Sequence, residues 1–264
     1  MNTNKFIAAV CFSILAVALV IGLMSCNGPA PTNGTDQTFQ LRGILTADEN
    51  RSWTLMAVDY RRDSVLRRLA DITLDTFTMQ FARPLFPIDS VFSIVTSSGL
   101  TFRTGSHKLR ITDSTVFTDS LTATAPDTFS ILTIYPANRL LQGVAEARLT
   151  WSGSTGAETY VIAAVHANAA YTGQGYSAYV TTQNPAGTFP PDVFSNGAGA
   201  ADTGWYYFYV YALTGSPDSV YARHLLPVPL PSQLADNITE TRFGGNFGMI
   251  LVAFRDSMHV VEQL

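Results

Sequence analysis

The sequence predicts an all-β protein with two antiparallel β-sandwich domains, one over residues 38–137 and one over residues 138–264. Thr, Val, Ile, Phe and Tyr alternate with polar residues along most of the chain, as in strands with one buried face. Gly and Pro interrupt these segments at short intervals, which is typical of turns between antiparallel strands. The run Tyr135-Pro136-Ala137-Asn138 is expected to join the two domains.

In the N-terminal domain, alternation predicts strands at residues 53–58, 72–76, 91–95, 107–111, 117–124 and 129–135. One short helix is expected over residues 63–69, because Val65, Leu66 and Leu69 recur at helix spacing. The rest of this domain is expected to be strands and turns.

In the C-terminal domain, the same pattern predicts strands at residues 147–151, 160–165 and 205–213. A further strand at 177–182 is expected inside a long loop over residues 171–203, which is rich in Gly, Ala and Pro. The chain is expected to end in a hairpin, with strands at 247–254 and 258–261 on either side of a turn at residues 255–257.

Core residues of the C-terminal domain resemble those of a fibronectin type III domain. In that family a Trp on strand B and a Tyr on strand C pack in the core, and an aromatic-x-Val-x-Ala pattern on strand F lines the opposite sheet. Trp151 and Tyr160 match the first two positions, and Phe208, Val210 and Ala212 match the pattern. The resemblance covers residues 145–225 and implies a fibronectin III-like sandwich.

Two other segments carry resemblances. Residues 105–111, continued through 122–126, resemble a transthyretin-like or immunoglobulin-like sandwich, which implies that fold for the N-terminal domain. Residues 244–248 resemble the end of uncharacterised two-domain surface lipoproteins encoded in outer-membrane gene clusters. The second resemblance implies no known activity.

The N-terminus carries the features of a lipid-anchored protein. Lys5 precedes an apolar stretch over residues 6–22, about the length of a signal-peptide core, and then the run Leu23-Met24-Ser25-Cys26. This run resembles the lipobox of bacterial lipoproteins, which implies that residues 1–25 are a signal peptide and that Cys26 becomes the lipidated N-terminus. An ordinary N-terminal anchor helix is the alternative. Residues 26–37, polar and rich in Gly and Pro, are expected to be a flexible tether.

Composition limits the partners of the mature chain. Removal of the signal peptide takes away Lys5 and Cys11, leaves the formal charge at −5, and leaves Cys26 as the one cysteine. Neither a disulfide nor nucleic-acid binding is expected of such a chain. The anchor predicts the cell envelope, and because Asn27 rather than Asp follows Cys26, the outer membrane, on its periplasmic face or on the cell surface.

The sequence shows no catalytic or metal-binding pattern. His107, His166, His224 and His259 are far apart and match no metal spacing, and no nucleophile motif occurs. A hydrolase would need facing carboxylates, which a sequence cannot test. We therefore expect no enzyme, no metal and no cofactor. A solvated face with surface ion pairs is expected from Asp59, Asp63, Asp71, Asp75, Arg61, Arg62, Arg67 and Arg68.

The strand at 205–213 contains a candidate binding surface. Because alternate side chains of a strand point to opposite faces, Tyr206, Phe208 and Val210 should face the core. The other face would then carry a row of rings that could anchor a protein partner, stack on sugars, or lie covered by residues 171–203 or by the C-terminal hairpin. The row consists of Trp205, Tyr207, Tyr209 and Tyr211.

These observations predict a membrane-anchored lipoprotein that acts as a non-catalytic binding or assembly module at the cell envelope. Its partner would be an envelope protein or a glycan. The alternative is a carbohydrate-binding surface lipoprotein that works with a transporter, because aromatic rows also stack on sugars. Both hypotheses depend on the lipid anchor at Cys26 and on the aromatic row.

Overall fold

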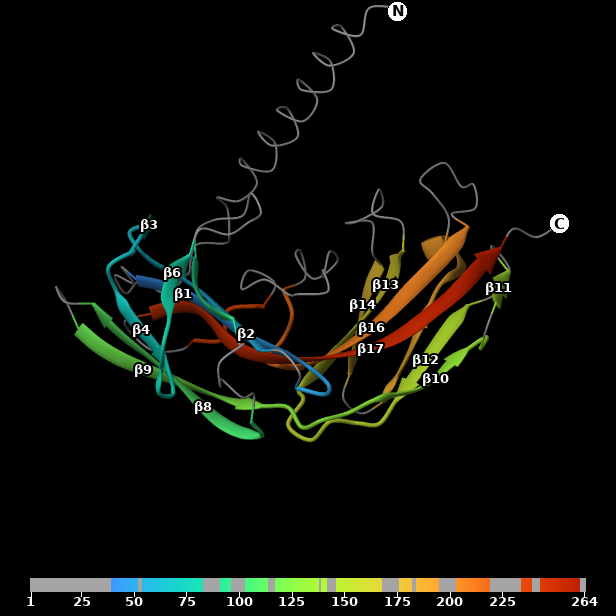
Figure 1. Cartoon of the computed structure of the whole chain (residues 1–264), viewed down its shortest axis with the longest axis horizontal. Coiled ribbons are helices and arrows are strands. Elements are labelled where there is room, and N and C mark those ends of the chain that lie inside the picture. Colours follow the sequence, from blue (N-terminus) through green and yellow to red (C-terminus); the bar gives the residue numbers. More distant parts are fainter. Residues whose placement is uncertain are drawn as a thin grey trace, which may run out of the picture. The chain divides into compact units, whose positions relative to one another are not determined.

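The computed structural model (Figure 1) confirms the all-β prediction; among the residues that it describes, the regular elements are strands and the short 3-10 helix Pro191–Phe194. It describes residues 39–51, 54–82, 91–95, 103–113, 117–137, 139–141, 146–167, 176–181, 184–194, 203–218, 234–238 and 243–261. The predicted signal peptide and tether, with Cys26, lie outside these residues. Residues 37–264 form one compact unit. No helix in the described part of the chain is long and apolar enough to cross a membrane.

Ten of the described strands form one large sheet, in the order β14-β13-β16-β17-β1-β2-β7-β6, with β11 beside β17 and β3 beside β2. Their bounds are β1 Phe39–Asp48, β2 Thr54–Arg62, β3 Val65–Leu66, β6 Gln80–Ala82, β7 Val91–Val95, β11 Arg139–Leu141, β13 Thr159–His166, β14 Tyr176–Thr181, β16 Gly204–Thr214 and β17 Phe243–Val261.

Two smaller sheets pack against this large one. The four-stranded sheet has the order β5-β4-β8-β9 and the three-stranded sheet the order β10-β12-β15. Their strands are β4 Asp71–Leu74, β5 Phe77–Thr78, β8 Gly105–Asp113, β9 Phe117–Ala125, β10 Ile131–Tyr135, β12 Ala147–Trp151 and β15 Ala186–Phe189.

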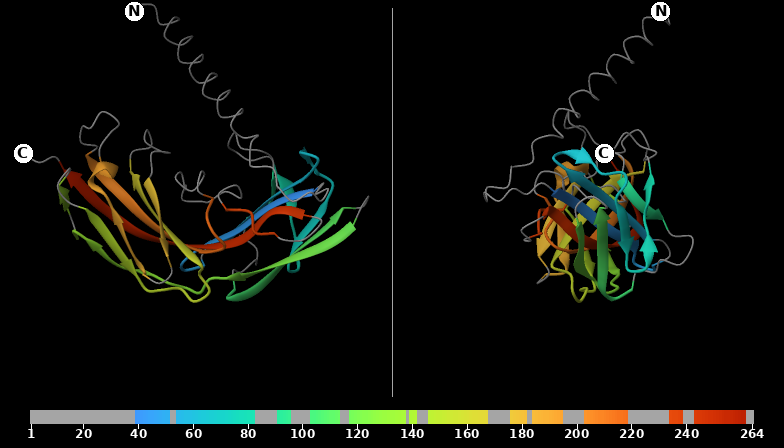
Figure 2. Two further views of the ribbon diagram at one scale, coloured as in Figure 1. Left: turned by 180° about the vertical axis from the view of Figure 1, so that it is seen from behind. Right: turned by 90° about the vertical axis from the view of Figure 1, so that its left-hand side faces the viewer.

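Strand β17 belongs to both sandwiches. Its first part, from Phe243 to Val252, pairs in parallel with β1, and the part from Met249 to Val260 pairs antiparallel with β16. In Figure 2 (left) this red strand runs from the blue strands β1 and β2 to the orange strand β16. The two sandwiches therefore share one strand and one continuous sheet, and their pairing is not purely antiparallel.

The predicted C-terminal hairpin is wrong, because residues 243–261 form one strand. The register with β16 shifts between Tyr206 and Phe208, where two steps along β16 oppose three steps along β17. This is a β-bulge, which accommodates one extra residue without reversing the chain. The polar residues at 255–257, which suggested a turn, lie at this bulge.

The short helix predicted over residues 63–69 is also wrong. Asp63 and Ser64 have positive φ angles of 49° and 66° and close a two-residue turn, with Arg62 paired to Val65. Two left-handed residues are the geometry of the tight turn that best joins antiparallel strands. The helix-like spacing of Val65 and Leu69 arises from this hairpin and the turn after it, where both side chains are exposed.

The N-terminal sandwich has its core between β1, β2 and β17 on one side and the four-stranded sheet on the other. Alternate residues of β8 are buried, among them Leu109 and Ile111, and they belong to one cluster with Leu45 and Met56. Because β17 contributes Met249 to the same cluster, this sandwich is built from both ends of the described chain.

The C-terminal sandwich has the core that the fibronectin III resemblance implied. Trp151 on β12 and Tyr160 on β13 are buried with ring centroids 5.2 Å apart. Phe208, Val210 and Ala212 on β16 are buried in the large sheet, opposite the sheet that carries Trp151. The Tyr160 hydroxyl accepts a hydrogen bond from the backbone N–H of Ser154. These positions confirm a fibronectin III-like sandwich.

Strand β10 adds to this C-terminal sandwich although it precedes the predicted boundary at residue 137. It pairs antiparallel with β12, and Phe129, just before it, packs on Tyr160 with ring centroids 5.9 Å apart. The division of the chain at residue 137 remains a prediction.

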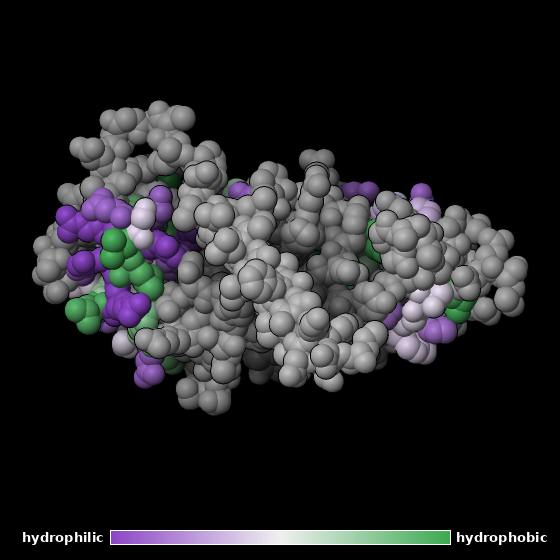
Figure 3. Space-filling model, turned by 90° about the horizontal axis from the view of Figure 1, so that it is seen from above, coloured by the Kyte–Doolittle hydropathy of each residue, from purple (hydrophilic) through white to green (hydrophobic). Residues whose placement is uncertain are grey.

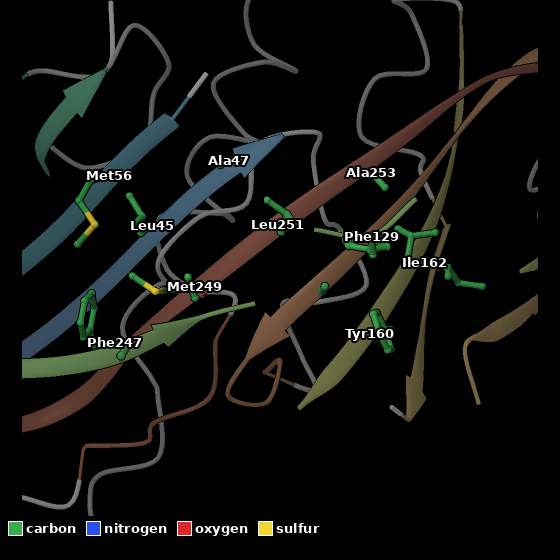
Figure 4. Close-up of a cluster of buried hydrophobic side chains, with 14 of the residues drawn as sticks. Leu45, Ala47, Met56, Phe129, Tyr160, Ile162, Phe247, Met249, Leu251 and Ala253 are labelled. Carbon is green, nitrogen blue, oxygen red and sulfur yellow. The ribbon is translucent and has the colours of Figure 1, made fainter. Parts of the chain in front are cut away.

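One apolar core runs along the inner face of the large sheet (Figure 4). Alternate side chains of β17, including Met249 and Leu251, lie between Leu45 of β1 and Tyr160 of β13. All of them belong to one buried cluster. Since burial of apolar surface is the main favourable term in folding, this shared core and the shared strand join the two sandwiches.

The opposite face of the large sheet also carries a buried apolar cluster. Leu234, from the connection between β16 and β17, packs in this cluster, and the Asn237 side chain bonds both backbone polar groups of Phe247. The other members are Ile44, Ala57, Val161, Ala163, Tyr211, Leu213, Ile250 and Val252. A second core on this face means that part of the predicted aromatic row is covered.

Candidate binding surface

The side chains of β16 alternate between the two faces of the sheet as the sequence predicts. Tyr206, Phe208 and Val210 are buried in the inner core. The aromatic residues at the intervening positions, Trp205, Tyr207, Tyr209 and Tyr211, lie on the opposite face.

Two rings from β17 extend this row sideways. The His259 ring lies 4.9 Å from that of Trp205, and the Phe254 ring lies 5.6 Å from Tyr207 and 5.2 Å from Tyr209, all between centroids. We call these five residues, Trp205, Tyr207, Tyr209, Phe254 and His259, the aromatic strip. Such spacings are those of favourable aromatic pairs.

Sequence reasoning missed Phe254 and His259 because a turn was expected between them. In a regular strand, two residues five positions apart point to opposite faces. The bulge in β17 changes this parity, so that Phe254 beside Tyr209 and His259 beside Trp205 share one face. No local sequence signal reports such a shift.

Exposure decreases along the row from one end to the other. Trp205 is 51% exposed and Phe254 43% exposed, whereas Tyr207 and Tyr209 are half-buried. Tyr211 is fully buried in the outer cluster, and its burial raises the pKa of its hydroxyl well above 10.0. Tyr211 was predicted as part of the surface, but it is a core residue, so the accessible surface ends before it.

The start of β16 is held in place beside Trp205. The backbone N–H of Ala167 donates a hydrogen bond to the carbonyl of Trp205, with 2.7 Å between nitrogen and oxygen. His166 packs edge-on against Tyr206, with ring centroids 5.0 Å apart. Gly204 has a φ of 142°, and a Cβ there would lie 2.6 Å from Nε2 of His166. The backbone that carries the exposed Trp205 is therefore held in place by these contacts.

His107 has a carboxylate neighbour, as a catalytic histidine often does, but here it joins two parts of the fold. Its Nδ1 lies 2.8 Å from a carboxylate oxygen of Asp75, and its Nε2 lies 2.9 Å from the carbonyl of Arg103. Both nitrogens of this buried ring therefore contact oxygen atoms of the protein itself.

Two of the predicted surface ion pairs are present among these carboxylates and arginines. Arg61 pairs with Asp59 at 2.9 Å, and Arg62 with Asp63 at 3.6 Å. Arg67 instead reaches the buried Asp113 through two contacts of 2.9 and 3.1 Å. This bidentate pair connects the turn after β3 to β8.

The other predicted site residues give no further site. Within the ranges that the structure describes, no three His, Cys, Asp or Glu side chains are grouped so that they could hold a metal ion. Cys26 and His224 lie outside the described residues. The aromatic strip is thus the surface on which a functional proposal can be built.

Comparison with known proteins gives limited guidance. No family model matches the chain, and no curated protein matches it. Among solved structures, a chimeric titin Z1Z2-Z1Z2 tandem functionalized with a GRGDS peptide from fibronectin is 11% identical, with a TM-score of 0.22 over 84% of this chain and 97% of that one. The chicken CNTN1 FN1-FN3 domains are 12% identical, with a TM-score of 0.23 over 70% of this chain and 61% of that one.

Proposed function

We propose that the protein is a lipid-anchored protein of the outer membrane that acts as a non-catalytic binding or assembly module. The aromatic strip is its contact surface. The observation that carries this proposal is the position of the strip: it lies at the opposite end of β17 from the point where the predicted tether joins the fold.

The length of β17 gives the separation. Phe243 pairs with Phe39 at the tether end, and His259 pairs with Trp205 at the strip end, sixteen residues further along the strand. At about 3.3 Å per residue this distance is roughly 50 Å. A flexible chain of the length of the tether adds about 20 Å on average. The fold thus acts as a spacer that presents the strip away from the anchor.

The composition of the strip suits a protein partner. Aromatic side chains are enriched in the parts of interfaces that contribute most to affinity. The half-buried Tyr207 and Tyr209 support the two more exposed rings, Trp205 and Phe254, so that little conformational freedom is lost on binding. Phe254 has no polar tip, which favours an apolar contact over a solvated one.

The strip can be tested in detergent extracts of the envelope. We expect the wild-type protein to migrate in native electrophoresis as part of a larger complex, and the Phe254→Asp variant to migrate alone. Leu132→Asp is the matched control, since Leu132 on β10 is 54% exposed and lies outside the strip. Equal migration of all three proteins would contradict the proposal.

The anchor can be tested separately. Growth with an alkyne-labelled fatty acid should label the wild-type protein and place it in the membrane fraction. The Cys26→Ser variant should carry no label. A membrane-bound but unlabelled wild-type protein would instead favour an ordinary N-terminal anchor helix.

A carbohydrate ligand is the second candidate, favoured by the exposure of Trp205, whose ring could stack on a sugar. Titration with a broad panel of oligosaccharides should then change the tryptophan fluorescence of the wild-type protein but not that of Trp205→Phe. Trp151 is buried and serves as an internal reference. No response across the panel would exclude this candidate.

A further inference from the structure

A second exposed apolar feature lies far from the aromatic strip, at the turn that follows β2. Leu69 is 94% exposed and Val65 is 65% exposed, the two highest values among the large aliphatic side chains of the described residues. Arg62 pairs with Val65 across the hairpin and contacts Asp63 at 3.6 Å, and Arg68 directly precedes Leu69. Figure 3 shows apolar side chains among strongly hydrophilic ones at the left of the view, where β3 and β4 lie in Figure 1. We call Val65 and Leu69, with these two arginines, the apolar tip.

The fold holds this tip in a fixed position. Asp63 and Ser64 close the hairpin that carries Val65, and the N–H of Arg67 donates to the carbonyl of Tyr60 at 3.0 Å. The bidentate contact of Arg67 with the buried Asp113 fastens the turn to β8. The backbone that carries the exposed side chains of Val65 and Leu69 is therefore held in place by these contacts.

The tip lies beside the point where the tether joins the fold. Phe39, the first described residue, pairs with Arg62, and the Cζ atom of Arg62 lies 5.4 Å from the centre of the Phe39 ring. Residues 27–38 separate Cys26 from Phe39, so that the anchor can be at most about 45 Å away even when the chain is extended.

We propose that the apolar tip contacts the bilayer in which Cys26 is anchored, with Leu69 and Val65 inserted at the interface and Arg68 at a lipid phosphate. The contact rests on the lipid anchor proposed above. Arg68 is exposed, and its guanidinium lies over the Phe81 ring at 5.5 Å, which leaves its outward edge for a phosphate.

Tethering makes such a small contact effective. Two aliphatic side chains would bind a bilayer only weakly from solution. Once Cys26 is in the membrane, the contact becomes intramolecular and its effective concentration is high. The tip then fixes which end of β17 faces the bilayer, so that the aromatic strip points away from it.

The lipidated protein offers a direct test, because acylation would consume the thiol of Cys26 and the mature chain has no other cysteine. Leu69→Cys can therefore carry a single environment-sensitive NBD dye. The protein is reconstituted in vesicles of phosphatidylethanolamine with a minority of phosphatidylglycerol and a lipid that carries a shallow nitroxide. Leu132→Cys, labelled in the same way, is the control at an exposed aliphatic position on β10.

We expect blue-shifted emission and nitroxide quenching at position 69 and neither at position 132. Val65→Asp in the Leu69→Cys background should lower the docked fraction about tenfold. Vesicle-bound protein without quenching at 69, or with equal quenching at both positions, would overturn the tip contact and leave the anchor intact. An emission shift without quenching would indicate a protein contact and also overturn it. Failure to float with the vesicles would overturn the anchor, and the tip contact with it.

Discussion

The pairing of β17 with β1 makes Gly245 the most sensitive glycine in the described part of the chain. Gly245 pairs with Leu41, has a φ of 117°, and its carbonyl accepts hydrogen bonds from the N–H groups of Asn237 and Ile238. A Cβ at this position would lie 1.9 Å from the carbonyl oxygen of Leu41. Gly245→Ala therefore forces the two parallel strands apart near the start of their hydrogen-bonded ladder.

The expected cost has two parts. A non-glycine residue in this region of φ costs about 1–3 kcal/mol. Displacement of a packed strand costs a further 1–3 kcal/mol or so. The sum, roughly 2–6 kcal/mol, is a large fraction of the stability of an ordinary domain.

Two control variants separate these contributions. Gly105 has a φ of 112° but no atom within 4 Å of an added Cβ, so Gly105→Ala should show the φ cost alone. Gly153 has only the Tyr160 hydroxyl near an added Cβ, at 3.9 Å, so Gly153→Ala should change stability by less than about 0.5 kcal/mol. Urea unfolding followed by circular dichroism measures all three. If Gly245→Ala cost no more than Gly105→Ala, the close approach of β17 to β1 would be refuted.

Three further predictions follow from buried polar groups. Arg67→Met leaves the Asp113 carboxylate buried without its ion pair and should cost about 2–4 kcal/mol in urea unfolding. Tyr160→Phe keeps the ring but removes the acceptor for Ser154 N–H, at about 1–2 kcal/mol by the same assay. Burial raises the pKa of Tyr211 above 10.0, the value that the phenol has in the unfolded chain. The free energy of unfolding that the neutral phenol contributes is therefore fully present below about pH 10 and is lost as the pH rises further. Tyr211→Phe should thus lose less of its free energy of unfolding than the wild type between neutral pH and about pH 11.

Elements with a regular period were predictable from the sequence. The strands expected at 91–95 and 147–151 are present with the same bounds as β7 and β12. The core positions of Trp151, Tyr160 and Phe208 were also predicted, because large aromatic side chains at alternate positions of a strand are usually buried in the core.

Long-range pairing was not predictable in the same way. β1 alternates Phe39, Leu41 and Gly43 with Gln40 and Arg42, a local strand signal that was missed. Its parallel partner is two hundred residues away in the sequence, and no local pattern specifies that pairing. The same holds for β17, where polar residues at a bulge have the composition of a turn.

The candidate site was predicted in part. The outward row on β16 follows from period two alone, but the coverage of Tyr211 depends on Leu234 and on the neighbouring strands of the large sheet. Phe254 and His259 joined the strip through the bulge. A side chain's face can be read from its own strand, whereas its exposure depends on which other segments pack over it.

The central claim is that the aromatic strip binds a partner at the envelope, and photo-crosslinking in intact cells tests it most directly. A benzoylphenylalanine replaces Phe254 in one strain and Leu132 in another, both exposed apolar positions, on β17 and β10. Irradiation should give one discrete adduct at position 254 that Trp205→Ala weakens, and no adduct at position 132. No adduct at 254, or the same adducts at both positions, would contradict the account.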